Sequence, residues 1–158
     1  DGTPLLRLRG GGPDRGGQAV RTHRKAVQAQ FVEPVRSGIK RTTIRPIPKR
    51  KRDVPQAGDA IVLYRWTGKP YRSKQEVIGR YRVITDACRV TVKTDRIVFH
   101  NVFGEGEDLA VIDNAESSDL TAVAYREGFK DWPEMSAWFE ASHGIPFTGI
   151  IIGWEAKP

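Results

Sequence analysis

The segment from Gly38 to Arg45, Gly-Ile-Lys-Arg-Thr-Thr-Ile-Arg, holds the residues whose types and spacing best suit chemistry. Its threonines and isoleucine favour a β-strand, in which successive side chains point to opposite faces. Thr43 and Arg45 would then share a face with Arg41, while Lys40 would lie where the strand begins. Cations and a hydroxyl that converge on one point suit the binding of an anion or a carbonyl, or attack on a carbonyl. The alternative is an exposed edge strand whose charges prevent edge-to-edge pairing.

The chain carries a formal net charge of +7, and this charge is unevenly distributed. Residues 1–103 contain 23 basic and 8 acidic side chains, whereas residues 104–158 contain 3 basic and 11 acidic ones. The basic run Lys49-Arg50-Lys51-Arg52 falls in a loop expected over residues 46–57, where each phosphate contact would add salt-dependent affinity. This distribution predicts an anion-binding face whose usual partner is a nucleotide or a nucleic acid. A solvated basic loop without a ligand is the alternative.

The elements that must position these residues show both strand and helix patterns. We expect strands at 25–29, 41–45, 60–66, 76–85, 87–93, 96–103 and 147–155. We expect helices at 31–37, at 118–126 and from an Asp131 cap to Gly144, each followed by a glycine. The acidic, glycine-bearing residues 104–118 are expected to form a loop. Short strands with two or three short helices indicate an α+β fold, arranged as a small curled sheet or barrel.

The length of 158 residues fits a single domain. Residues 1–18 are rich in glycine, proline and arginine, so we expect a disordered arm followed by a domain over residues 19–158. The chain lacks a signal-peptide pattern and any run of ~18 apolar residues. Its single cysteine, Cys88, excludes an internal disulfide. We therefore expect a cytoplasmic protein that does not bind membranes. The three histidines lack a metal-binding spacing, so neither a metal nor another cofactor is expected.

The pattern G-x-K-x-x-T-x-R at Gly38–Arg45 resembles the signature of the ASCH family, within the PUA-like superfamily. Further features of this family agree with the resemblance, which covers roughly residues 25–156. They are the preceding short helix, the Gly58-Asp59 turn into a strand, the sequence Glu127-Gly128-Phe129 and the closing strand to Trp154.

The resemblance implies a small PUA-like β-barrel with two or three short helices packed beside it, and a basic cleft between them. Family members bind RNA or nucleotides. Some resemble amidohydrolases that remove the acyl group from N4-acetylcytidine, and another branch is associated with ribonuclease activity. The resemblance therefore implies RNA or a modified nucleotide as the partner, with DNA as an alternative. It leaves open whether the domain only binds its ligand or also hydrolyses it, and it leaves the oligomeric state open.

Carried over by position, Lys40, Thr43 and Glu127 would be the catalytic residues of a hydrolase, and Arg45 would bind an anion. Thr43 would attack the acyl carbon or position a water, and Lys40 would act as the base if its pKa were lowered. Glu127 would protonate the leaving nitrogen or hold the cytosine edge. Arg41 and the basic run at residues 49–52 would contact phosphates. The alternative for Glu127 is a structural ion pair with Lys40 or Arg45.

The aromatic residues allow two interpretations. Tyr64, Trp66 and Tyr71 are expected to lie mainly in the core, and the alternative is an exposed surface that stacks nucleobases. Trp132, Trp138 and Trp154 are expected to pack between helices and sheet.

Overall fold

The computed structural model describes residues 19–100, 110–113 and 117–155 of the chain. Within these residues it has an α+β fold of eight strands in two sheets, three α-helices and one 3-10 turn. The fold class expected from the sequence is therefore confirmed. The arm expected over residues 1–18 lies outside the described residues.

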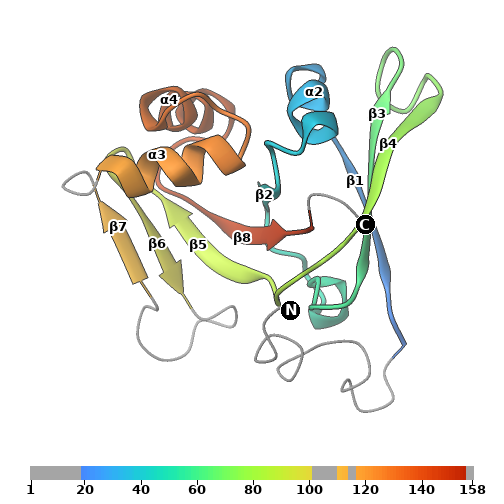
Figure 1. Ribbon diagram of the computed structural model, residues 1–158, viewed down its shortest axis with the longest axis horizontal. Coiled ribbons are helices and arrows are strands. Elements are labelled where there is room, and N and C mark those ends of the chain that lie inside the picture. Colours follow the sequence, from blue (N-terminus) through green and yellow to red (C-terminus); the bar gives the residue numbers. More distant parts are fainter. Residues whose placement is uncertain (1–18, 101–109, 114–116, 156–158) are drawn as a thin grey trace.

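The smaller sheet has the strand order β1-β3-β4, and Figure 1 shows its β3–β4 hairpin beside α2. Its strands are β1 (Thr22–Ala26), β3 (Ala60–Trp66) and β4 (Gln75–Arg82). β1 is parallel to β3, whereas β4 is antiparallel to it, with a bulge where Leu63 and Tyr64 meet β4. Ile61 and Leu63 point into the core, so the alternation of a strand places Tyr64 and Trp66 on the opposite face.

The larger sheet has the strand order β2-β8-β5-β6-β7, with every pair antiparallel. Its strands are β2 (Thr42–Arg45), β5 (Cys88–Val92), β6 (Arg96–His100), β7 (Ala110–Asp113) and β8 (Phe147–Gly153). In β8, Gly149 allows β2 to approach closely, since a Cβ there would lie 2.3 Å from the Arg45 carbonyl oxygen. A single bridge between Val83 and Trp154 joins the two sheets. Neither sheet closes on itself in the described residues, so the expected barrel is not confirmed.

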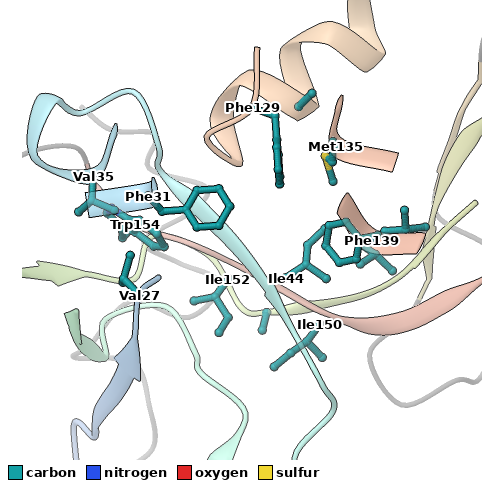
Figure 2. Close-up of a cluster of buried hydrophobic side chains, with 14 of the residues drawn as sticks. Val27, Phe31, Val35, Ile44, Phe129, Met135, Phe139, Ile150, Ile152 and Trp154 are labelled. Atoms are coloured by element: carbon teal, nitrogen blue, oxygen red, sulfur yellow. The ribbon is translucent and has the colours of Figure 1, made fainter. Parts of the chain in front are cut away.

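The three helices are α2 (Ala29–Ser37), α3 (Ser117–Arg126) and α4 (Trp132–Ser142), and the 3-10 turn is η2 (Lys51–Asp53). Figure 1 shows α3 and α4 together above the larger sheet, and Figure 2 shows Phe31, Phe129 and Phe139 directed toward Ile44 and the β8 isoleucines. The expected Asp131 cap is present, because its side chain accepts a hydrogen bond from the Glu134 amide at 2.9 Å. None of these described helices is long and apolar enough to cross a membrane.

Three expectations need correction. The first strand is β1 rather than residues 25–29, because Ala29 already begins α2. Part of the loop expected over 104–118 forms β7, since β6 offers it a partner strand; residues 104–109 and 114–116 lie outside the described residues. Tyr64, Trp66 and Tyr71 are absent from the core cluster, whereas Trp132 and Trp154 are buried in it and Trp138 packs against it.

Candidate nucleotide-binding site

The end of α2 fixes the position of Lys40. Gly38 adopts a left-handed conformation at the helix C-terminus, with φ 85°, and its amide donates to the Val35 carbonyl. The Lys40 amide then donates to the Pro34 carbonyl at 2.9 Å. The backbone therefore turns directly from the helix into β2, and this turn directs the Lys40 side chain inward, where it is only 4% exposed.

The end of α3 places Glu127 against the same turn. The Arg41 amide donates to the Arg126 carbonyl at 2.9 Å, which ties the start of β2 to the helix end. Gly128 has φ 99°, and a Cβ there would lie 2.9 Å from the Phe31 ring and 3.1 Å from Cδ of Lys40. A glycine is thus required after Glu127 both by the backbone conformation and by close packing. The Glu-Gly-Phe sequence brings a carboxylate to the buried lysine.

Lys40 and Glu127 form a buried ion pair, and both side chains also form hydrogen bonds to nearby groups of the protein. The Lys40 Nζ donates to the main-chain oxygens of Thr42, at 2.8 Å, and Glu127, at 2.6 Å, and lies 3.8 Å from Glu127 Oε1. The Thr42 hydroxyl donates to Glu127 Oε2 at 2.5 Å. Burial lowers the pKa of Lys40 and nearby Arg45 adds to this, whereas Glu127 opposes it. The Phe31 ring covers the ammonium group, with Nζ 4.8 Å from the ring centroid.

Thr43 and Arg45 form a second polar pair on the same cavity. The Arg45 Nε donates to Thr43 Oγ1 at 3.0 Å, and its Nη2 donates to the Ala26 carbonyl at 2.6 Å. Burial lowers the pKa of Arg45, although a guanidinium remains protonated in proteins. These two bonds hold the guanidinium in the wall of the cavity.

The cavity between α2, β2 and α4 has a volume of about 170 Å³. Its polar lining includes Lys40, Thr43, Arg45 and Glu127. Its apolar lining is mainly aromatic: Phe31, Phe129, Trp138 and Phe139. Three of these rings pack against one another, with Phe31, Phe129 and Trp138 centroids 5.2 to 5.8 Å apart. Phe31 and Phe129 meet edge to face, with an interplanar angle of 80°, and Figure 2 shows them as neighbours. A cavity with aromatic walls and a few convergent polar groups is typical of a small-molecule site.

The other predicted binding residues lie at different places. Arg41 is exposed and does not line the cavity. Lys49 and Arg50 line a neighbouring open depression of about 710 Å³, which shares Pro46 with the cavity. Lys51 and Arg52 are exposed on η2 and line neither.

The sequence interpretation missed two parts of the site. The depression also includes Arg24 and Lys25, and burial lowers the pKa of Lys25 with Arg45 as a second cause. The bond between Thr42 and Glu127 was also missed, since simple alternation places Thr42 opposite Thr43. The charges on β1 are visible in the sequence, but nothing local indicates that they lie beside residues 46–50.

The Gly58-Asp59 turn and His23 have a structural role. The Asp59 carboxylate lies 2.9 Å from the His23 Nε2 and accepts hydrogen bonds from the amides of Arg21 and Gln56. These bonds hold the start of β1 against the start of β3. In the described part of the chain, no group of three potential metal ligands occurs.

No family model matches the chain, and neither a curated protein sequence nor a solved structure matches it. The resemblance to ASCH domains therefore stays a prediction.

Proposed function

We propose that this protein is an ASCH-type, PUA-like domain that holds a nucleobase of an RNA or a nucleotide in the cavity between α2, β2 and α4. The observation that supports this most directly is that the cavity has a positively charged polar side next to its aromatic walls. Lys40 and Arg45 face the cavity with a single carboxylate, Glu127, so its polar side has a net positive charge. Aromatic rings bind the faces of bases, and cations attract the attached phosphate.

Arg45 and Thr43 have the free hydrogen-bonding capacity that a ligand needs. A guanidinium has five N–H donors, and Arg45 uses one toward Thr43 and one toward Ala26. The Thr43 oxygen accepts from Arg45, so its hydroxyl hydrogen can donate to a base or phosphate. Because the cavity is smaller than the roughly 300–1,000 Å³ of pockets for drug-sized ligands, a single base would enter while its sugar and phosphate stay outside.

Binding of cytidine monophosphate and of a short single-stranded RNA tests this proposal. Isothermal titration calorimetry would compare the wild type with Arg45→Gln and with Arg41→Gln as a matched control on the same segment. We expect Arg45→Gln to weaken binding at least about tenfold, as for a lost charged hydrogen bond, and Arg41→Gln to change it little. Equal affinities of the two variants would remove the cavity from the proposed function, and absence of binding in the wild type would reject the ligand class.

A hydrolase that acts on N4-acylcytidine-like nucleosides, or on RNA, is the second candidate. The lowered pKa of the buried Lys40 favours it, because a neutral lysine could accept a proton. In such a reaction water would attack the acyl carbon, directly or after Thr43, and release cytidine and a carboxylic acid. The Lys40 Nζ donates to two carbonyl oxygens. These bonds favour the protonated amine and argue against Lys40 as the base.

Incubation with N4-acetylcytidine and with labelled RNA separates the two candidates. Cytidine released by the wild type and not by Lys40→Met would establish the amidohydrolase, and shortened RNA the ribonuclease. If both substrates stay intact, the hydrolase candidate is rejected and the proposal of a binding domain is retained. A cytoplasmic location belongs to the same proposal and rests only on the sequence.

A further inference from the structure

The β3–β4 hairpin carries three aromatic rings in contact, two on one face of β3 and one in the hairpin loop. The ring centroids of Tyr64 and Trp66 are 5.8 Å apart, and those of Trp66 and Tyr71 are 5.1 Å apart. At the other end of the row, the Arg24 guanidinium lies 4.9 Å from the Tyr64 ring centroid. We call Arg24, Tyr64, Trp66 and Tyr71 the aromatic strip.

Tyr71 occupies a conformation that burial does not explain. It is a non-glycine residue with φ 65°, a backbone region that costs of order 1 kcal/mol or more, yet 87% of its surface is exposed. The hairpin loop holds it there with its own hydrogen bonds. Ser73 Oγ accepts from the Gly68 amide and donates to the Lys69 carbonyl, and Thr67 bonds to Lys74. The loop therefore holds its backbone in a conformation that presents the Tyr71 ring to solvent.

The strip is surrounded by positive charge. Lys69, Arg72 and Lys74 lie in the hairpin loop, and residues 67–74 contain no acidic side chain. Among the described residues, none of these three cations forms a salt bridge within 4.0 Å. One exposed ring, Tyr71, and two half-buried rings, Tyr64 and Trp66, lie near cations without a salt bridge. This combination matches the two parts of a nucleic acid strand, since bases stack and phosphates are anionic.

The strip also continues to the cavity. The Val27 amide donates to the Tyr64 carbonyl at 2.8 Å, and Val27 lines the cavity. Arg24 belongs both to the strip and to the basic depression that shares Pro46 with the cavity. One strand could thus place a base in the cavity and its neighbours on the strip.

We propose that the aromatic strip binds unpaired bases of a single-stranded nucleic acid whose neighbouring nucleotide occupies the cavity. This inference rests on the proposed function of the cavity. Tyr71 and Trp66 stack bases, while Arg24 and the cations of the hairpin loop contact the phosphates. The strip makes the protein select a strand over a free nucleotide and an unpaired strand over a duplex.

Fluorescence anisotropy with a labelled single-stranded RNA of about 12 nucleotides tests the strip, because aromatic sites engage strands of about this length. The same sequence as DNA and as a duplex completes the set. We expect Tyr71→Ala to weaken single-strand binding roughly tenfold, and Tyr71→Phe to retain it. Tyr125→Ala, at a half-exposed tyrosine on α3 that lines neither hollow, is the matched control. Substituting Lys69, Arg72 and Lys74 by glutamine lowers the salt dependence, log K against log salt, by about 2 if all three contact phosphates.

Tryptophan fluorescence separates the strip from the cavity. Trp138 lines the cavity and Trp66 lies in the strip. Fluorescence quenching that disappears in the Trp66→Phe variant therefore reports binding at the strip. A free nucleotide should bind Tyr71→Ala as well as it binds the wild type. If Tyr71→Ala binds the single strand as tightly as Tyr125→Ala does, the strip proposal is overturned and the cavity proposal stands. If the strand quenches Trp66 while no nucleotide binds the cavity, the cavity proposal is overturned, and with it the placement of a neighbouring nucleotide there, whereas the stacking of bases on the strip is supported. If gel filtration shows that the protein self-associates through the strip, and RNA does not change this association, the proposal is also overturned.

Discussion

Lys40 and Arg45 line one cavity, but the two cations are bonded in different ways. Lys40 donates hydrogen bonds to two main-chain carbonyls and faces the buried Glu127, whose carboxylate also accepts a hydrogen bond from Thr42. Arg45 uses two of its five N–H groups, toward Thr43 and Ala26. The first group resembles a structural ion pair that joins α2, β2 and α3, whereas the second is a fixed cation with spare donors. Charge and burial alone would not distinguish them, but their hydrogen bonds do.

Glu127→Ala should give the largest effect on stability. It leaves the buried Lys40 without its carboxylate, which costs about 3–5 kcal/mol in the free energy of unfolding. Urea denaturation followed by fluorescence measures this, with Glu140→Ala at an exposed site of α4 as the control. Arg45→Gln, in contrast, should cost about 1 kcal/mol while weakening ligand binding. A Glu127→Ala loss no greater than that of Arg45→Gln would erase the contrast between the two cations.

The neighbouring threonines should differ in the same direction with smaller effects. Thr42→Val removes the hydrogen bond to the buried Glu127 carboxylate and should cost about 2 kcal/mol of unfolding free energy. Thr43→Val, whose hydroxyl only accepts from Arg45, should cost less than about 1 kcal/mol and weaken nucleotide binding a few-fold. Denaturation and calorimetry on both variants measure this. If Thr43→Val proved the more destabilising change, Thr43 rather than Thr42 would belong to the structural pair.

The pH dependence of stability gives the smallest and most specific effect. The pKa of Lys40 lies below its ordinary value of 10.5 in the folded protein, so between the two values the unfolded state binds more protons. Stability should therefore rise with pH in that interval relative to Lys40→Met, by at most about 1.4 kcal/mol per pH unit. This gain is complete above 10.5 and is lost as the pH falls through the folded-state pKa. Urea denaturation of both proteins from about pH 7 to 10 tests it. A difference that falls with pH would mean that Glu127 dominates and raises the pKa of Lys40.

Local sequence signals predicted the parts of the site that depend on neighbouring residues. Alternation along 41–45 placed Thr43 and Arg45 on one face, and both line the cavity. Gly38 predicted the end of α2, on which the position of Lys40 depends. Glu127 could be associated with Lys40 only through the family resemblance, since 87 residues separate them.

The features that the sequence did not predict depend on distant partners. β3 is apolar along most of its length, so its sequence does not tell which residues face inward. Packing buries Ile61, Val62 and Leu63, whereas Tyr64 and Trp66 are half-buried and lie outside the core cluster. β7 has only four residues, Ala-Val-Ile-Asp, between acidic segments, and it becomes a strand because β6 lies beside it.

The position of β8 between β2 and β5 has a consequence for the order of folding. Thr43 pairs with Ile152 and Cys88 with Ile151, so β2 gains its partner only from the far end of the chain. Contacts this distant in sequence slow folding, because a long loop must close before they form. During synthesis, a chain that has exposed α2 and β2 still lacks both Glu127 and β8. The cavity therefore assembles only when nearly the whole domain has been made, and truncated chains should lack it.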